Sequence, residues 1–467
     1  MRWIAAEIAD VVGGTVTQGD PATVIERVTQ DSREIGAQPT LFVPLLAERD
    51  GHEFVVAAAA AGAVASLSSR PAADLAGLPD RTVVIEVDDT ALALSELGSA
   101  GRARLDGSSP VRPVVGITGS VGKTTTKDFL AAILAADRPT HASRESFNNE
   151  IGVPLTILNG PDDTEALVLE MGARGVGHIA LLCSIGRPTV GIVTTVGAAH
   201  TSEFGSVEAV AQAKGELVEA LPAAAAGGVA VLNATHPLVV GMAERTAARV
   251  VTFGAGGDVR AESIALDDEL IPTFTLVSPE YRAEIVLGAR GVHLVDNALA
   301  AAAAALAVGA PIEAVVAGLA APTLSPMRMA LTRSPRGTRI LDDSYNANPM
   351  STEAALRSLA ALSIESGGRR FAVLGEMAEL GEVGPAEHAR LGKVAADLGI
   401  HLIAVNAPDY LVDLDPSSGV DIAADIPEAL RLLADPSSGA PIGPDDAVLV
   451  KGSRVAGLER LVDLLSA

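Results

Sequence analysis

A glycine-rich turn followed by a lysine and three threonines is the part of this sequence with the clearest chemistry. Residues Gly116–Thr126 read Gly-Ile-Thr-Gly-Ser-Val-Gly-Lys-Thr-Thr-Thr and directly follow a strand-like apolar run, Pro113–Val115. A glycine-rich turn between a strand and a helix presents backbone N–H groups to phosphate, and the helix N-terminus adds partial positive charge there. Lys123 would reach the outer phosphates, and the Thr124 hydroxyl would ligate Mg²⁺.

The loop departs from the strict Walker pattern at one position. That pattern has glycine six residues before the lysine, where this chain has Ile117. Glycine stands instead at Gly116 and Gly119. The sequence therefore predicts a phosphate cradle of a particular subtype. Its predicted nucleotide-binding residues are Gly119, Ser120, Val121, Gly122, Lys123, Thr124 and Thr125.

An acidic residue follows the next strand-like run. Glu170 comes directly after the apolar residues Ala166–Leu169. A carboxylate at the end of a strand beside a phosphate loop is a usual second ligand, or water-orienting group, for nucleotide-bound Mg²⁺. A surface glutamate at the start of a loop is the alternative. Beside the phosphate loop, the metal role is favoured.

Two further residues could serve a second metal ion. His200 lies past the strand-like run Val190–Val193, although a single histidine is more often a cap or a core residue. Lys214 lies on the next predicted helix in a chain with only five lysines, where arginine carries most positive charge. A lysine amine can react with CO₂ to give a carbamate, which is an anion that binds metal. A solvated helix lysine is the alternative for Lys214.

Polar groups also gather at other turns, above all after the strands of the last third of the chain. Asn149 lies in a polar turn that could instead be a helix cap, and Arg328 lies in a Pro-rich linker, where it could reach a phosphate or be a surface hinge residue. Ligands of open α/β sheets bind at the carboxyl ends of strands. Three such ends carry polar runs, at 342–349, 375–381 and 451–454.

Composition excludes several classes of function. The chain has 467 residues and a formal net charge of −24, so its surface repels nucleic acid and anionic membranes. The only cysteine, Cys183, allows no intrachain disulfide. Met1–Val12 lacks the apolar core of a signal peptide, and Leu221–Ala243 is interrupted by prolines and glycines. We expect a soluble cytoplasmic protein without membrane insertion, and nothing demands more than a monomer.

The order of predicted elements indicates an α/β fold in three domains. A small N-terminal α/β domain (1–108) is expected to contain strands at 41–45, 64–68 and 82–87 and to end in a linker at Arg102–Arg112. The central domain (109–330) has apolar runs at 114–117, 166–169, 190–193 and 229–232, typical of a doubly wound, mostly parallel sheet, with an antiparallel insertion at 258–287 and an alanine-rich helix at 297–308. After a linker at Ala321–Pro335, the Rossmann-like C-terminal domain (331–467) is expected to have strands at 338–341, 371–374, 402–405 and 447–450.

Together these motifs resemble the Mur ligase family, the ATP-dependent amide-bond ligases of peptidoglycan precursor assembly. The resemblance covers nearly the whole chain and includes the loop's departure from the Walker pattern. Asp31-Ser32-Arg33 is similar to the family's UDP-sugar domain. One departure is His293-Leu294-Val295-Asp296, where the family often shows His-Asn.

The resemblance implies specific roles. Thr124 and Glu170 would hold one Mg²⁺, and His200 with a carbamylated Lys214 would serve a second. Catalysis would rest on Lys123, Glu170, His200 and Lys214. Asn297 would contact adenine, and Arg328 the γ-phosphate, with Asp343 also at the ATP. Substrate contacts would come from Ser32, Arg33, Asn149, Tyr345, Asn346, Asn348 and Lys451.

The run Asp342–Pro349 resembles that of the family member that adds D-alanyl-D-alanine to UDP-N-acetylmuramoyl-tripeptide. Members that add the third residue tend to carry a Tyr-Ala-His-type sequence there, and this run has no histidine. The implied reaction passes through an acyl phosphate and releases ADP and phosphate. Three alternatives remain: a sibling that adds the diamino acid, a nucleotide-binding regulator, and a bare ATPase or kinase. Folate-type ligases share the cradle but should not need a UDP-sugar domain.

Overall fold

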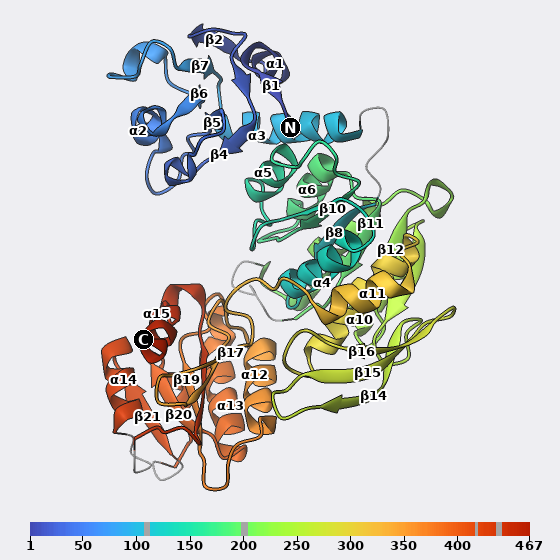
Figure 1. Ribbon diagram of the computed structural model, residues 1–467, viewed down its shortest axis with the longest axis vertical. Helices are drawn as coiled ribbons and strands as arrows, with labels where there is room; N and C mark the ends of the chain where they lie inside the picture. Colours follow the sequence, from blue (N-terminus) through green and yellow to red (C-terminus); the bar gives the residue numbers. More distant parts are fainter. Residues whose placement is uncertain (107–112, 198–203, 416–418, 436–440) are drawn as a thin grey trace.

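The computed structural model describes residues 1–106, 113–197, 204–415, 419–435 and 441–467, and it contains three α/β bodies, as predicted (Figure 1). The N-terminal body has a five-stranded sheet in which only the β2–β7 pair is antiparallel. Its order is β2 (Thr15–Gln18), β7 (Val83–Glu86), β6 (Ala63–Ser68), β5 (Thr40–Phe42) and β4 (Arg27–Thr29). A two-stranded ribbon, β1 (Trp3–Ile4) with β3 (Val24–Ile25), lies beside it.

The central body is built on a six-stranded, wholly parallel sheet. Its order is β13 (Arg249–Phe253), β12 (Val229–Asn233), β11 (Val190–Val193), β8 (Val114–Thr118), β10 (Ala166–Glu170) and β9 (Thr140–Ala142). One face packs on α4 (Lys123–Ala135), α10 (Leu294–Ala307) and α11 (Ile312–Ala320), and the other on α5 (Gly152–Leu158), α6 (His178–Gly186) and α8 (Val207–Glu219). The alanine-rich prediction is confirmed, because α10 buries its alanines against α4. The doubly wound, parallel arrangement is therefore confirmed.

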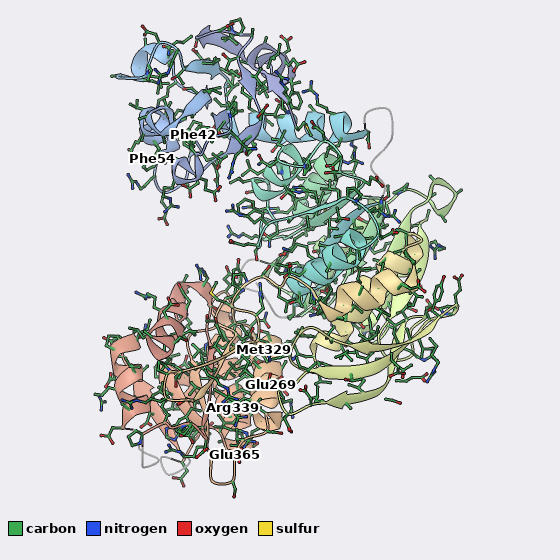
Figure 2. The ribbon with its side chains drawn as sticks, viewed as in Figure 1. Phe42, Phe54, Glu269, Met329, Arg339 and Glu365 are labelled. Carbon is green, nitrogen blue, oxygen red and sulfur yellow. The ribbon has the colours of Figure 1, made fainter. Side chains whose placement is uncertain are left out.

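The predicted antiparallel insertion is also confirmed. It is the three-stranded sheet β14 (Arg260–Leu266), β15 (Pro272–Val277) and β16 (Arg282–Val286). The turn between β14 and β15 reaches the C-terminal body, where Figure 2 labels Glu269. The next residue, Leu270, is fully buried in the core of the C-terminal body and has a left-handed backbone (φ 67°). The insertion thus anchors the C-terminal body to the central one.

The C-terminal body has five parallel strands and one antiparallel edge strand. Its sheet order is β17 (Ala330–Arg333), β18 (Arg339–Asp342), β22 (Ala447–Lys451), β19 (Arg370–Leu374), β20 (His401–Val405) and β21 (Val420–Ala423). The helices α12 (Pro349–Ala361) and α13 (Gly384–Asp397) supply one core, and α14 (Ile426–Ala434) and α15 (Glu459–Ser466) supply the other. Among the described residues, no helix is long and apolar enough to cross a membrane.

Both predicted linkers are shorter than expected. The residues from Arg102 to Asp106 are the last turns of α3 (Thr90–Asp106), and Arg102 is buried, with an ion pair to Asp106 at 2.6 Å. The glycines of this helix serve close packing, since a Cβ at Gly98 would lie 2.7 Å from Cβ of Pro154 on α5. At the second linker, β17 begins at Ala330 and pairs with β18, so residues 330–333 belong to a sheet.

Candidate active site

The phosphate loop leaves the centre of the central sheet and is held by the end of the neighbouring strand. The backbone N–H of Ser120 donates to Thr195 O at 2.9 Å, and that of Val121 donates to Thr195 Oγ1 at 3.0 Å. The Thr194 hydroxyl donates to Val121 O at 2.5 Å. Gly119 (φ 151°) must lack a side chain, because a Cβ there would lie 1.8 Å from Thr194 Oγ1. β11 therefore fixes the shape of the loop.

The last loop glycine touches the asparagine predicted to contact adenine. Gly122 is the N-cap of α4 and has φ 87°, which L side chains rarely adopt. A Cβ there would lie 2.4 Å from Oδ1 of Asn297, on the first turn of α10. The close approach of the loop and α10 thus depends on the absence of a side chain at position 122.

Replacing Gly122 with alanine is expected to raise the KM for ATP by about ten-fold or more, since backbone strain of ~1 kcal/mol adds to displacement of Asn297. Gly256→Ala is the matched control, because Gly256 (φ 78°) has the same backbone region but no atom within 4 Å of the place that a Cβ would take. Steady-state kinetics and thermal melting of both variants check this. Equal KM values for the two variants would show that the contact with Asn297 has no part in binding ATP.

Several buried cations crowd around the loop. The Lys123 ammonium donates to Gly119 O at 2.7 Å, and burial lowers its pKa, which Glu170 raises and Arg328 lowers. Lys214 is 2% exposed, and burial followed by the charge of Lys123 lowers its pKa well below the usual value. Holding like charges together in low dielectric is unfavourable, so both shifts favour the neutral amines. An anionic ligand would relieve that repulsion.

Lys214 is placed by the packing of α8. Ser206 is the N-cap of this helix, and its hydroxyl accepts from the Ala209 N–H at 3.1 Å. Next to Lys214, Gly215 leaves room for the Arg245 guanidinium, because a Cβ there would lie 1.9 Å from Nη1. These contacts fix the buried face of α8 that carries the lysine.

The residues predicted to bind a metal ion fit that role in part. Oε1 of Glu170 accepts from Asn148 Nδ2 at 2.8 Å, whereas its buried Oε2 has no hydrogen-bond partner among the described residues. A buried carboxylate oxygen without a partner is costly, and a cation would satisfy it. His200 lies outside the described residues. Within those residues, the structure contains no group of three or more His, Cys, Asp or Glu side chains that could hold a metal ion.

Arg328 extends from the linker to the phosphate loop. Its Nη2 donates to Thr124 Oγ1 at 3.2 Å, and its guanidinium lies 4.3 Å from the ring centroid of Tyr345. Its buried Nε has no hydrogen-bond partner among the described residues. Figure 2 labels the next residue, Met329, where the linker enters the C-terminal body. The arginine therefore joins the central and C-terminal bodies at the point where a phosphate would bind.

The predicted polar strand ends of the C-terminal body lie together, because β18, β22 and β19 are neighbours. The Lys451 ammonium donates to Asp343 Oδ2 at 2.5 Å and to Asn346 O at 2.8 Å. Burial lowers the Lys451 pKa, and Asp343 raises it. Asn348 caps α12, its Oδ1 accepting from Ser351 N at 3.0 Å. Lys451 and Asp343 thus form a buried ion pair. The side chain of Asn348 already accepts one hydrogen bond as the cap of α12, so only its remaining polar atoms are free for a ligand.

One cavity of about 640 Å³ joins the phosphate loop to these strand ends. The predicted site residues that line it are Ser120, Val121, Gly122, Lys123, Thr124, Thr125, Asn149, Glu170, Asn297, Arg328, Asp343, Tyr345, Asn346, Asn348 and Lys451. Oδ1 of Asn149 also accepts from the N–H of Gly152, the first residue of α5, at 2.9 Å. Gly119 and Lys214 do not line it. Ser32 and Arg33 lie in the N-terminal body, where Arg33 is exposed and paired with Asp31 at 2.6 Å.

Several lining residues were not among the predicted site residues. They are Ser146, Asn148, Thr194, Thr195, Asn233, His293 and Asp296. Thr194 and Thr195 directly follow β11, so the rule of polar strand ends would have found them. His293 has no such signal; burial lowers its pKa to about 4, and its Nδ1 lies 3.4 Å from Ser358 Oγ of α12.

Comparison with known proteins gives this fold and site a family. Two family models match, the Mur ligase middle domain over residues 117–305 and the Mur ligase glutamate ligase domain over residues 327–454. Curated relatives are similar over nearly their whole length. The chain belongs to the Mur ligase family.

Within that family, two similar curated proteins from different organisms share one name. UDP-N-acetylmuramoyl-tripeptide–D-alanyl-D-alanine ligase of Mycobacterium tuberculosis H37Rv is 40% identical, covering 99% of this chain and 97% of its own. The ligase of that name from Escherichia coli K12 is 36% identical, and the match covers 98% of this chain and 97% of that protein. MurF from Acinetobacter baumannii superposes with a TM-score of 0.85 at 30% identity, covering 100% of this chain and 99% of its own. MurF ligase from Thermotoga maritima, solved in complex with ADP, superposes with a TM-score of 0.77 at 27% identity, and the match covers 94% of this chain and 97% of that chain.

Proposed function

We propose that this protein is an ATP-dependent amide-bond ligase that adds D-alanyl-D-alanine to UDP-N-acetylmuramoyl-tripeptide in peptidoglycan precursor synthesis. The observation that carries the proposal is the cavity shared by two bodies, with a phosphate loop and buried cations on one wall and the Asp343–Lys451 strand ends on the other. The 40% identity to a ligase of that name, over 99% of this chain, supports the same substrates.

The proposal assigns the ligands to the two walls. ATP takes the loop 119–125, with Asn297 at the adenine and Arg328 and Asp343 at the outer phosphates. The strand ends with Tyr345, Asn346, Asn348 and Lys451 face the reacting ends of the peptide substrates, as does Asn149. Ser32 and Arg33 take the distant UDP-sugar end. The corresponding domains are 1–108, 109–330 and 331–467, acting as a monomer in the cytoplasm.

Magnesium belongs to the proposal through the donors present. Thr124 and Glu170 would hold one ion, as the unpartnered Glu170 Oε2 suggests, and His200 with carbamylated Lys214 would hold the second. When bound, Mg²⁺ supplies charge neutralisation at phosphate oxygens. A carbamate at Lys214 would also turn its repulsion with Lys123 into attraction.

The chemistry follows from what the chain's own side chains do. A free carboxylate is a poor acyl donor, so the tripeptide carboxylate attacks the γ-phosphorus of ATP, giving an acyl phosphate and ADP. Lys123 and Arg328 neutralise charge on the transferring oxygens. The dipeptide amine then attacks the acyl carbon, and phosphate leaves from the tetrahedral intermediate as the amide forms. Closure of the C-terminal body over the cavity excludes water, which would hydrolyse the acyl phosphate.

The alternatives differ in what they leave unexplained. A bare ATPase or kinase does not need the polar strand ends on the facing wall, and a regulator that has lost ligation does not need Glu170, Lys123 and Lys214 together. The sibling ligase, which adds the diamino acid, differs in the amine that it accepts.

Phosphate release from ATP and Mg²⁺ with UDP-N-acetylmuramoyl-tripeptide, with and without D-alanyl-D-alanine, tests the proposal. We expect turnover that depends on the dipeptide. Turnover with a UDP-N-acetylmuramoyl-dipeptide and a free diamino acid instead would assign the chain to the sibling reaction. ATP binding without turnover on either pair would support the regulator.

A further inference from the structure

Helix α4, which begins at the phosphate loop, contacts the interdomain linker at two residues, Thr124 and Asp128. Asp128 lies one turn of α4 beyond Thr124, so both side chains lie on the same side of the helix. Asp128 Oδ2 accepts from the backbone N–H of Ser325 at 2.7 Å, and Oδ1 accepts from the Ser325 hydroxyl at 3.2 Å. Three residues later, Arg328 meets Thr124. The linker thus runs along one turn of α4 between two attachments.

The linker has an unusual backbone on both sides of Arg328. Met327 (φ 58°) and Met329 (φ 53°), on either side of Arg328, are both left-handed, which costs about 1–2 kcal/mol for a non-glycine residue. Such conformations persist only where surrounding contacts enforce them. On the C-terminal side, the Met329 N–H donates to Asp343 Oδ1 at 3.3 Å. On the N-terminal side, Met327 O accepts from the Tyr345 N–H at 3.4 Å, and the pair of bonds from Ser325 to Asp128 attaches the linker to α4.

The carboxylate of Asp128 is itself held in place. Lys127 Nζ lies 3.0 Å from Asp128 Oδ1 and donates to Ser143 O at 2.7 Å and Glu145 O at 3.1 Å. Asp128 is 7% exposed and Lys127 is 3% exposed. The loop that Lys127 holds leads to Asn148, which binds Glu170. Neither Lys127 nor Asp128 lines the cavity, so any effect on ligand must pass through the segments that they hold.

We infer that Asp128, oriented by Lys127, is a positioning residue for the ligation reaction, which fixes the linker so that Arg328 meets the γ-phosphate. This inference rests on the proposed function. A residue serving only stability would not depend on Arg328 for its kinetic effect. Asp128 and Arg328 share no hydrogen bond in the described part of the chain, and the shortest connection between them along the chain is the linker from Ser325 to Arg328.

A double-mutant cycle between positions 128 and 328 tests the inference. Asp128→Asn keeps an acceptor for Ser325 N–H but removes the charge that orders both Lys127 and the hydroxyl. We expect kcat to fall about ten-fold, with a smaller change in the KM for ATP. In the Arg328→Ala background, the same substitution should lower kcat by less than about two-fold, since the group that it positions is gone. Asp137→Asn, at an exposed carboxylate just past the end of the same helix, should leave kcat unchanged.

Equal fold-losses of kcat in the two backgrounds would overturn the inference, as would an Asp128→Asn protein with wild-type kcat. If Asp128→Asn does not fold, Ser325→Ala replaces it; this change removes only the hydroxyl bond and should show a loss of about two- to three-fold that again disappears with Arg328→Ala. If the wild-type protein shows no dipeptide-dependent turnover, the proposed function itself is contradicted. That result requires no variant, so it is distinguishable from a failure of the inference about Asp128.

Discussion

Replacing Lys123 with methionine is expected to lower kcat by about 10³-fold while leaving the fold intact. The substitution keeps the length of the side chain but removes the charge that we propose faces the transferring phosphoryl group, and loss of one such group commonly costs 10²–10³-fold. Because burial lowers the Lys123 pKa in the ligand-free protein, its charge is held there at a cost. The thermal midpoint without nucleotide should therefore be unchanged or higher than in the wild type.

The two measurements together make this prediction specific. Kinetics in the presence of saturating ATP and melting curves with and without ATP would be compared with those of Lys393→Met, which changes an exposed lysine on α13 and should alter neither. A Lys123→Met protein that melts well below the wild type would mean that the ammonium stabilises the loop itself, through its bond to Gly119 O. Retained turnover would remove Lys123 from the mechanism.

Replacing Lys214 with alanine is expected to reduce kcat by about 10²-fold or more, with partial recovery when a short carboxylic acid such as formate or acetate is added. The lowered pKa of Lys214 makes its neutral amine available to react with CO₂, and neutral amine is the reactive form. A carbamate places a carboxylate at the end of the side chain. A small carboxylate that diffuses into the space left by alanine can supply the same charge.

Controls separate carbamate chemistry from general salt effects. Lys123→Met should not respond to formate or acetate, and chloride at the same ionic strength should not restore Lys214→Ala. Removing bicarbonate and CO₂ from the wild-type assay should lower its rate in a way that added bicarbonate reverses. A folded Lys214→Ala protein with wild-type kcat would show that no anion is needed there; one that no carboxylate restores would favour a structural role for the lysine on α8.

The interior of each sheet could be predicted from the sequence, and the edges could not. Each predicted strand outside the insertion is an interior strand of one of the three sheets, where continuous apolar runs are buried on both faces. The strands of these sheets that were missed, β2, β4, β9, β13, β17 and β21, are their edges. Edge strands are half-exposed, as the burial of β13 and β17 shows, so their sequences carry no continuous apolar signal.

The site was predicted to the extent that it follows from strand ends. Glu170, Asp343 and Lys451 could be placed because the carboxyl ends of neighbouring parallel strands meet. The contact of Arg328 with Thr124 depends on two left-handed methionines and on Asp128, and no local pattern encodes such an arrangement. The start of the first linker was wrong for a related reason: residues 102–106 continue α3, which Gly98 and Gly101 allow to pack closely on α5, whereas composition alone suggested a linker from Arg102.

The transfer of oxygen from the tripeptide to phosphate tests the central claim most directly. The terminal carboxylate of UDP-N-acetylmuramoyl-tripeptide would be labelled with ¹⁸O, and the products of a reaction with ATP, Mg²⁺ and D-alanyl-D-alanine would be analysed by mass spectrometry or ³¹P NMR. If the carboxylate attacks the γ-phosphorus, its attacking oxygen leaves with phosphate, so we predict one labelled oxygen in each inorganic phosphate formed. Amide product accompanied by unlabelled phosphate would contradict the acyl-phosphate account.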